Sequence, residues 1–551
     1  DPEMSRGLGD VYKRQEYRRI DMSFTTTVYF VFLLIGLVFY YLIPKNYRWT
    51  VLLVMSYIYY LSYRLKAVVF ILFTTITVYL LGIMLERIQN GADAYLAQNK
   101  QVLSREEKKS YKNKIKHKKR IYLVIALLLN FGMLAAIKYS GFAISGVNHI
   151  LRAVGTQKQF SLFTIAAPIG ISFFTFQAMS YIIDIYQGKY ACEKNFFKFA
   201  LFVSFFPQIM QGPIGRYNRL APTLFEGNSY SLQNIQFGIQ RIGWGIFKKL
   251  IMADRAGVFV NAAFADSNQF HGMIRIIGLL MYSVQLYMDF SGGIDIVIGS
   301  AQMFGVRMDE NFRQPYFSKS IGEFWRRWHI TLGTWMKDYI FYPFSLSKWS
   351  NKAAKWGKKH LGDHLGKMLP ICFANLLIFF IVGVWHGSEA RYIVYGLYNG
   401  VIIALSNLLS PVYKKGFKVF HINSESRIWK VFQILRTFIL INIGWVFDVS
   451  VSGMHSAITT LKMFIVNLDF AQVNAQTFAI IGLETRDYVI IGIGCIVVLI
   501  VSIIKEMGIN VREALALKPL PVRWAVYYAF FAAIIILSYV TDNSGFMYAA
   551  F

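Results

Sequence analysis

The stretch SIGEFWRRWHITLGTWMKDYIFYPF, residues Ser320 to Phe344, decides how the rest of the chain is interpreted. It combines three Trp, two Arg and one His within a segment of helical length, in an otherwise apolar protein. The spacing of Trp325, Trp328 and Trp335 predicts one helix with a broad apolar face. A helix with this much charge and aromatic surface suits neither lipid nor water alone. We therefore expect it to lie at a membrane interface or to line a polar cavity.

The composition around this stretch indicates a membrane protein. Of the 551 residues, 55% are hydrophobic and only 16% are charged, whereas a soluble chain would carry more charge. Apolar stretches of spanning length recur, so we predict an all-α polytopic membrane protein. The net charge of +28 comes from Lys and Arg that cluster between the apolar stretches. Such clusters are typical of cytoplasmic loops beside anionic lipid, so we expect membrane lipid and not nucleic acid as the partner.

About eleven or twelve transmembrane helices are expected from spanning length, with one or two re-entrant or interfacial pieces. The expected spans are residues 25–43, 49–62, 67–84, 121–139, 168–185, 235–251, 273–288, 368–385, 390–409, 429–447, 488–504 and 524–539. The segment PQIMQGPIGRY, 207–217, carries two Pro and two Gly that break a helix, which predicts a buried turn or re-entrant segment. We expect residues 1–21 to be a non-native or disordered leader and residues 22–551 to form a single membrane domain.

Two basic stretches are predicted to face the cytoplasm. Residues 86–120 form a loop or a solvated helical hairpin, with nine Lys or Arg between Arg105 and Arg120. Residues 348–367 carry six Lys against one Asp and are expected to form a second loop. The three cysteines, Cys192, Cys372 and Cys495, lie apart and show no metal-ligand spacing, so we interpret them as packing residues. No phosphate-binding loop, dinucleotide fingerprint or zinc-protease motif is present, and we expect no metal site.

Two histidines combine an aromatic or apolar setting with membrane depth. His386 closes the apolar run NLLIFFIVGVWHG, where an ionisable group is costly and therefore a functional candidate. The alternative is a structural His that donates to a backbone carbonyl at a helix end. For His329, which tryptophans flank, a packing role is the competing interpretation. Asp289 could belong to a buried polar hinge or cap a helix, and Arg326 could meet an anionic substrate or reach lipid phosphates.

Five motifs in fixed order then support a resemblance. The sequence MDFSGGIDIVIGSAQMFGV is followed by ENFRQPY, by IGEFWRRWHITLGTWMKDYIFYPF, by VGVWHG and by YGLYNG. This order of motifs resembles the membrane-bound O-acyltransferase family. Within that family it is most similar to the bacterial alginate O-acetyltransferase type, and the D-alanyl transfer proteins are related members. The resemblance covers nearly all of residues 22–551. It implies the fold of that family, with its helices arranged around a central tunnel.

The resemblance also implies site residues. The catalytic His of the family's WHG motif corresponds to His386, and its second His, in the RWH motif, corresponds to His329. Asn399 stands where relatives often have His, a departure that we do not expect to affect catalysis. The candidate substrate-binding residues within the shared motifs are Asp289, Asn311, Trp325, Arg326 and Trp385.

The implied activity is transfer of a short acyl group, acetyl in the first instance, from a cytosolic thioester across the membrane to a hydroxyl of an exported or cell-wall polysaccharide. The thioester, acetyl-CoA or an acyl-carrier protein, would be a co-substrate, with no bound cofactor. A neutral imidazole can take the hydroxyl proton. We assign that role to His386, with His329 orienting or polarising the thioester carbonyl, and expect the tryptophans to exclude water. The family commonly works with a membrane-anchored extracellular partner of the SGNH-hydrolase-like type, in the bacterial cell membrane.

Two alternatives stay open at this point. A teichoic acid D-alanyltransferase would share the fold and the histidines but would take its acyl group from a carrier protein. A membrane transporter or lipid flippase would explain the polar intramembrane residues without any acyl chemistry.

Overall fold

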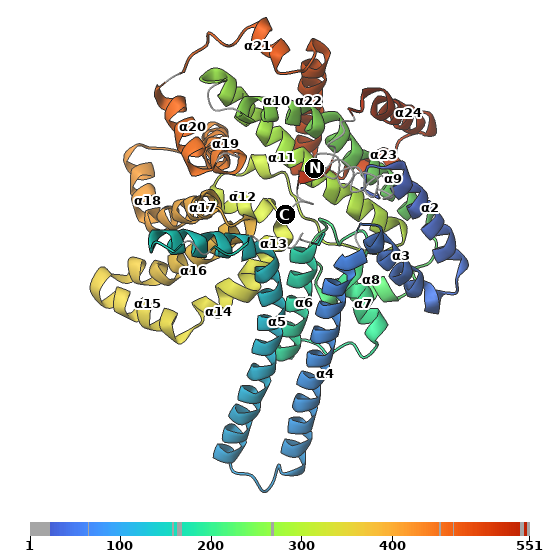
Figure 1. Ribbon diagram of the computed structural model, residues 1–551, viewed down its shortest axis with the longest axis vertical. Coiled ribbons are helices and arrows are strands. Elements are labelled where there is room, and N and C mark those ends of the chain that lie inside the picture. Colours follow the sequence, from blue (N-terminus) through green and yellow to red (C-terminus); the bar gives the residue numbers. More distant parts are fainter. Residues whose placement is uncertain are drawn as a thin grey trace. The chain divides into compact units, whose positions relative to one another are not determined.

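The computed structural model describes residues 22–63, 65–156, 159–161, 168–265, 269–450, 453–466, 468–539 and 545–547. Every secondary-structure element within these ranges is a helix (Figure 1), so the predicted all-α class is confirmed. The expected leader, residues 1–21, lies outside the described residues. The described chain divides into two compact units, which we treat separately: one comprises Asp1–Ile242 and Ile296–Met308, the other Gly243–Asp295 and Asp309–Ala549.

The first unit contains the N-terminal helices. They are α2 (Thr27–Leu42), η1 (Lys45–Tyr47), α3 (Arg48–Tyr63), η2 (Leu65–Ala67), α4 (Val68–Gln98), α5 (Arg105–Ala153), α6 (Ile171–Gln187), α7 (Phe196–Ser204), α8 (Tyr217–Phe225) and most of α9 (Leu232–Ile246). Its longest feature is a hairpin in which α4 and α5 run side by side (Figure 1). At the start of α5 the Ser104 side chain accepts from the Glu107 N–H, and the Glu107 carboxylate accepts from the Ser104 N–H. This pair of hydrogen bonds is a capping box, and it marks the end of the turn between α4 and α5. The helical-hairpin form of residues 86–120 is therefore confirmed.

The break predicted at residues 207–217 is also observed. Residues 205–216 lie in no helix, and all of them are buried. Backbone groups that leave a helix inside a protein need other partners. Two polar side chains serve as such hydrogen-bond partners. Gln177 on α6 donates to the carbonyl of Phe202 at 2.5 Å, and the Ser56 hydroxyl on α3 accepts from the Phe206 N–H at 3.0 Å. The irregular segment is thus held by hydrogen bonds within the first unit.

The second unit contains the remaining elements. They are η3, a π-helix (Phe247–Ala253), α10 (Asp254–Ala265), most of α11 (Met273–Met303), η4 (Pro315–Phe317), α12 (Ile321–Arg327), α13 (Ile330–Met336), η5, a π-helix (Lys337–Phe341), α14 (Tyr342–Ser345), α15 (Lys348–Leu361), α16 (Asp363–His386), α17 (Ala390–Leu408), α18 (Ser410–Val419), α19 (Arg427–Val449), α20 (Met454–Val466), α21 (Ala475–Ile480), α22 (Thr485–Glu506), α23 (Val511–Ala516) and α24 (Leu520–Leu537).

Seven of the described helices are long and apolar enough to cross a membrane, or up to eight if the bent pair α17 and α18 forms one span. The chain is therefore a polytopic membrane protein, although the sequence had led us to expect eleven or twelve spans. The difference has a local cause, because α2 and α3 have 16 residues each and α9 has 15 before it passes into the π-helix η3. Exposed apolar side chains such as Leu34, Val38 and Leu42 on α2 are consistent with contact to lipid.

The second basic stretch, predicted as a loop, is mostly helical, because residues 348–361 form α15 and residues 363–367 form the start of α16. The Ser347 hydroxyl caps α15 by accepting from the Ser350 N–H. The helix ends at Gly362, whose φ of 87° lies in the left-handed region that favours glycine. The chain then reverses, and a Cβ on Gly357 would lie 2.9 Å from the Cα of Gly366. This close approach lets α15 pack back against the first turns of α16.

Both basic segments are expected to face the cytoplasm, and cysteine accessibility tests this. Ser110 on α5 and Asn351 on α15 are exposed, so Ser110→Cys and Asn351→Cys place a reactive thiol on each segment without disturbing the packing. Neither thiol should react with a membrane-impermeant maleimide applied to intact cells, and both should react after permeabilisation. The wild-type chain gives the background from the three native cysteines. Labelling of either position in intact cells would contradict the orientation.

Candidate active site

The Trp-rich segment is not the single helix that its spacing predicts. It divides into α12 and α13, and the break falls at Trp328 and His329. His329 has φ 45° and ψ 53°, a left-handed conformation that costs a non-glycine residue roughly 1–3 kcal/mol and persists only where its surroundings enforce it. Of the predicted apolar face, Trp328, Leu332 and Trp335 are buried, and Trp325 is partly exposed.

Asn311 enforces this break from the preceding loop. Its side chain is fully buried, and its Oδ1 atom accepts from the Thr331 backbone N–H at 3.0 Å and from the Thr331 hydroxyl at 2.9 Å. Its carbonyl accepts from the Ile330 N–H at 3.0 Å. Asn311 therefore caps the start of α13 from outside the helix, where His329 supplies no capping hydrogen bond of its own. The candidate substrate-binding residue Asn311 thus lies at the site as a positioning residue.

The same contact assigns the tautomer of His329. The Nδ1 atom of His329 lies 3.2 Å from Asn311 Oδ1, an oxygen fixed as an acceptor by its bond from the Thr331 N–H. Nδ1 must therefore carry the proton, which leaves the lone pair on Nε2. Burial, with a further contribution from His386, lowers the pKa of His329 to about 3. A neutral imidazole with Nε2 as acceptor can orient a hydroxyl or take its proton, but it has no Nε2 proton with which to polarise a carbonyl.

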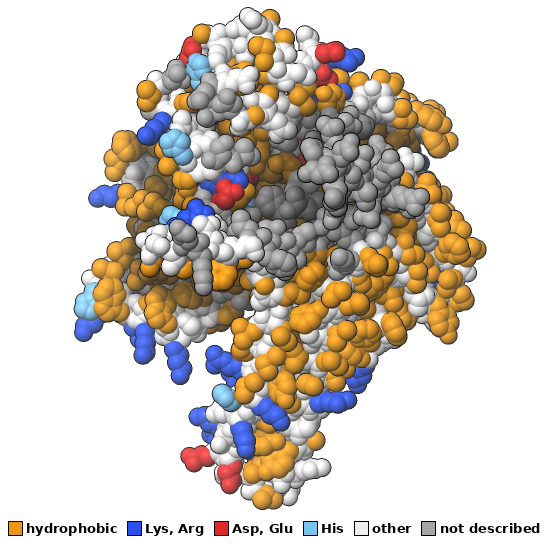
Figure 2. All heavy atoms as spheres, in the orientation of Figure 1, with side chains coloured by type: hydrophobic (Ala, Val, Ile, Leu, Met, Phe, Trp, Pro, Cys, Tyr) orange, Lys and Arg blue, Asp and Glu red, His pale blue; other side chains and the backbone are white. Residues whose placement is uncertain are grey.

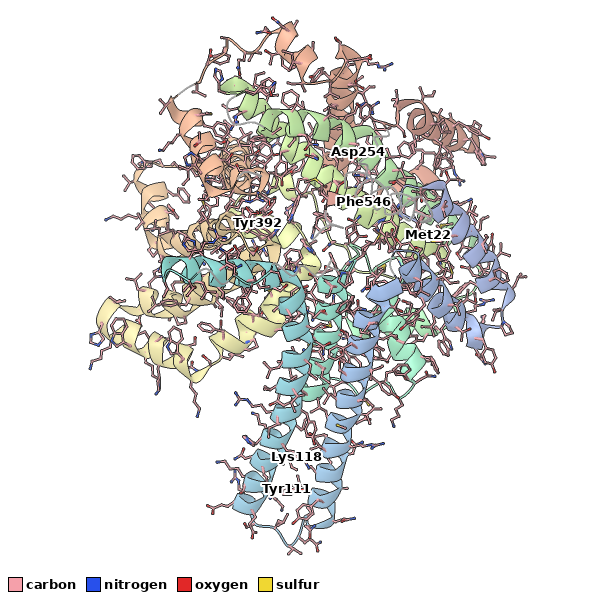
Figure 3. The ribbon with its side chains drawn as sticks, viewed as in Figure 1. Met22, Tyr111, Lys118, Asp254, Tyr392 and Phe546 are labelled. Carbon is pink, nitrogen blue, oxygen red and sulfur yellow. The ribbon has the colours of Figure 1, made fainter. Side chains whose placement is uncertain are left out.

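His386 is the last residue of α16 and is buried. Its position is fixed by unusually close packing between α16 and α17: a Cβ on Gly396 would lie 2.1 Å from the Phe379 carbonyl oxygen, and one on Gly383 would lie 2.5 Å from that of Tyr392. Larger residues at either glycine would force the helices apart. The imidazole then packs against Tyr395, with ring centroids 5.6 Å apart, and against Tyr392 (labelled in Figure 3), with centroids 6.2 Å apart.

Trp385 joins the two histidines. Its ring centroid lies 6.1 Å from that of His329 and 5.0 Å from that of His386. Phe290 of α11 covers another side of the His329 ring, with centroids 4.9 Å apart and the planes nearly perpendicular. The two histidines thus share one aromatic surround within the second unit. Such a setting excludes water and strengthens electrostatic interactions.

A cavity of about 710 Å³ opens beside His329. Three of the residues proposed from the sequence line it, namely Trp325, Arg326 and His329. The Trp325 indole N–H donates to Asn399 Oδ1 on α17 at 3.1 Å, which holds the indole against the cavity wall. Because Asn399 serves as this acceptor, the residue that departs from the family pattern has a positioning role here.

The remaining wall of the cavity is apolar with a few polar groups, as is typical of small-molecule sites. Polar side chains come from Asn375 on α16 and from Ser406 and Asn407 on α17. Sequence reasoning missed these three, although a polar residue within an apolar helix is a signal that could have found them. Arg326 and the exposed Lys337 add positive charge, and no carboxylate is among the described residues that line the cavity. The site therefore favours an anionic ligand.

Asp289 lies in a different environment. Its Oδ1 atom pairs with the buried Lys249 ammonium of η3 at 2.7 Å, and Lys249 also pairs at 2.8 Å with Asp254, which Figure 3 labels. Its Oδ2 atom accepts from the Met547 N–H at 3.0 Å. The structure therefore places Asp289 in an ion-pair cluster that holds the C-terminal segment, and does not bring it to the cavity beside His329.

Comparison with known proteins identifies a family and several relatives. The sequence model of the MBOAT, membrane-bound O-acyltransferase family, matches residues 193–447. A probable alginate O-acetylase of Pseudomonas syringae is 32% identical over 427 residues, which cover 77% of this chain and 72% of the relative. A peptidoglycan O-acetyltransferase of Helicobacter pylori is 30% identical over 370 residues, covering 62% and 64%. A teichoic acid D-alanyltransferase of Bacillus subtilis is 31% identical over 255 residues, covering 45% and 60%.

Proposed function

Because this chain belongs to the membrane-bound O-acyltransferase family and is an O-acyltransferase, we propose that it moves a short acyl group, acetyl in the first instance, from a cytosolic thioester to a hydroxyl of an exported or cell-wall polysaccharide. The observation that carries the proposal is the pair His329 and His386, which both contact Trp385 next to a cavity that His329 lines. Family membership also favours an acyltransferase over a transporter or flippase, because a transporter or flippase would not need such a pair of histidines.

In the proposed step the acceptor hydroxyl oxygen attacks the thioester carbonyl carbon. A C–O bond forms, the C–S bond breaks, and the hydroxyl proton passes to His386 as general base, which returns it to the leaving thiolate. The products are an ester and a free thiol. His329 orients the acceptor hydroxyl through its Nε2 lone pair, a role that suits the tautomer set by Asn311 better than polarisation of the carbonyl. Trp325 and Trp385 limit water access and so suppress thioester hydrolysis.

The charge of the cavity suits the donor. Acetyl-CoA and the prosthetic arm of an acyl-carrier protein both carry phosphate near the thioester-bearing chain, and Arg326 and Lys337 provide cations on the cavity lining. Acetyl is the better supported group, because the alginate O-acetylase relatives match 77% of this chain and the Bacillus D-alanyltransferase 45%. D-alanyl transfer from a carrier protein is the second candidate.

The family resemblance also suggests a location and a partner. We propose that the protein lies in the bacterial cell membrane and works with a separate, membrane-anchored extracellular protein of the SGNH-hydrolase-like type, which completes transfer to the polysaccharide. The acceptors named for the relatives, alginate and peptidoglycan, are the first to test.

The direct test uses the purified full chain in proteoliposomes. Acetyl-CoA, acetyl-carrier protein and D-alanyl-carrier protein, each labelled in the acyl group, are supplied in turn with alginate or peptidoglycan oligosaccharides. We expect release of free thiol from an acetyl donor together with label in an alkali-labile ester. Consumption of the D-alanyl donor alone would select the second candidate, and stability of all three thioesters would contradict acyl transfer.

A further inference from the structure

A second cavity, of about 510 Å³, lies in the first unit between the α4–α5 hairpin and the end of α6. Three lysines of α5 line it, Lys112, Lys116 and Lys119, at the i, i+4 and i+7 positions of one helical face. Like charges at this spacing repel and destabilise a helix unless an opposite charge meets them. The facing helix α4 supplies only one carboxylate to the lining, that of Asp93. The lining therefore carries an excess of positive charge.

The buried Lys119 side chain contributes to this excess of positive charge. Its side chain is only 7% exposed, yet no ion pair joins it to a carboxylate in the described part of the chain. Its ammonium donates instead to Gln89 Oε1 at 2.8 Å and lies 5.5 Å from the centre of the Tyr186 ring. The Gln89 amide in turn donates to both oxygens of Asp93 at 3.0 Å. A neutral amide thus separates the buried ammonium from Asp93, the one carboxylate among the described residues that line the cavity, and burial of a charge without a direct ion pair is costly.

The position of the cavity along the hairpin points to the ligand. The outer half of the hairpin carries many Lys and Arg side chains (Figure 2), whereas the apolar part of α5 begins at Ile121, two residues after Lys119. The cavity therefore lies where the polar hairpin meets the membrane-spanning part of the helix. Tyr111 and Tyr186 line the same cavity (Figure 3 labels Tyr111), and aromatic residues with a polar tip favour this level of a membrane.

We propose that this cavity binds a phosphate ester, and that its source is the headgroup of an anionic phospholipid of the membrane. The three lysines would meet the phosphate, with Lys119 at the inner end and the exposed Lys112 and Lys116 toward the hairpin tip. The same charge could accept the phosphates of a soluble nucleotide such as those of coenzyme A, and the test separates the two sources. The site does not depend on the proposed acyl transfer.

The test measures binding of tail-labelled phosphatidylglycerol to the purified full chain in a neutral detergent. Lys112→Ala/Lys116→Ala removes two lining charges from exposed positions of α5. Lys114→Ala/Lys118→Ala is the matched control, because it removes two charges at the same spacing of the same helix from residues that do not line the cavity. We expect the first pair to weaken binding by about tenfold or more, since each lysine near an anionic headgroup contributes roughly a factor of five. The control pair should change the affinity by less than about twofold.

Two further arms decide the ligand. Tail-labelled phosphatidylcholine, which has no net charge, should bind at least tenfold more weakly than phosphatidylglycerol. Adenosine 3′,5′-bisphosphate should fail to displace the labelled phosphatidylglycerol, and displacement at micromolar concentration would overturn the lipid as the source. Equal losses in the two lysine pairs would overturn the site itself, because they would show attraction by the overall charge of the hairpin.

Discussion

Replacing His386 with alanine is expected to lower acyl transfer by about 10³-fold, within the range that a general base contributes, while the protein still inserts and folds. The imidazole lies at the end of α16 in an aromatic surround, and an alanine there removes the group assigned to take the hydroxyl proton. The cavity of about 710 Å³ is not lined by His386, so its shape should change little. The measurement is turnover per folded molecule with a labelled acetyl donor, together with the elution volume and melting temperature of the variant.

His360 provides the control for this substitution. It lies on the exposed side of α15 and contacts Trp356, with ring centroids 5.2 Å apart. His360→Ala should keep turnover within about twofold of the wild type, as is usual for surface substitutions away from a site. Wild-type turnover in folded His386→Ala would remove His386 from the mechanism.

Replacing His329 with asparagine is expected to lower turnover by about 10²-fold, because the lone pair that orients the acceptor hydroxyl is lost. Asparagine is the right substitution for this position. It tolerates the left-handed conformation better than most residues, so the break between α12 and α13 can persist. A valine would instead change the backbone and the ring together. Turnover per folded molecule and the melting temperature are measured in parallel.

The two readouts separate the interpretations of His329. If it only packs against Phe290 and Trp385, His329→Asn should lower the melting temperature and leave the turnover of the folded fraction unchanged. Asn311→Ala gives an independent check, because it removes the acceptor that fixes the His329 tautomer while it keeps the imidazole. That variant should also lose turnover, and a normal rate would argue against the positioning role of Asn311.

The sequence was sufficient to predict the class of fold, because that class depends on local composition, and its motifs were sufficient to select His329 and His386 as candidates. It was not sufficient to predict their geometry. Periodicity gave Ser320–Phe344 as one helix, whereas Asn311, nine residues before that segment, provides the hydrogen bonds that divide it. A contact from outside a helix leaves no trace in the helix's own spacing.

Asp289 illustrates the same limit. Its place in a polar motif made it a candidate for substrate binding, but its role depends on Lys249 of η3 and on Met547 near the C-terminus, 258 residues away in sequence. Periodicity in an apolar stretch also does not distinguish a spanning helix from a short buried one. The 14 buried residues of the 17-residue helix α6 show this, because they face protein on nearly every side.

The measurement that tests the central claim most directly compares His329→Asn, His386→Ala and the double variant in the labelled acetyl-transfer assay. If the two imidazoles act on one bound substrate, their contributions are not additive. The double variant should then transfer acetyl no more than about threefold more slowly than His386→Ala alone. A loss equal to the product of the two single losses would show two independent effects and would contradict a shared site.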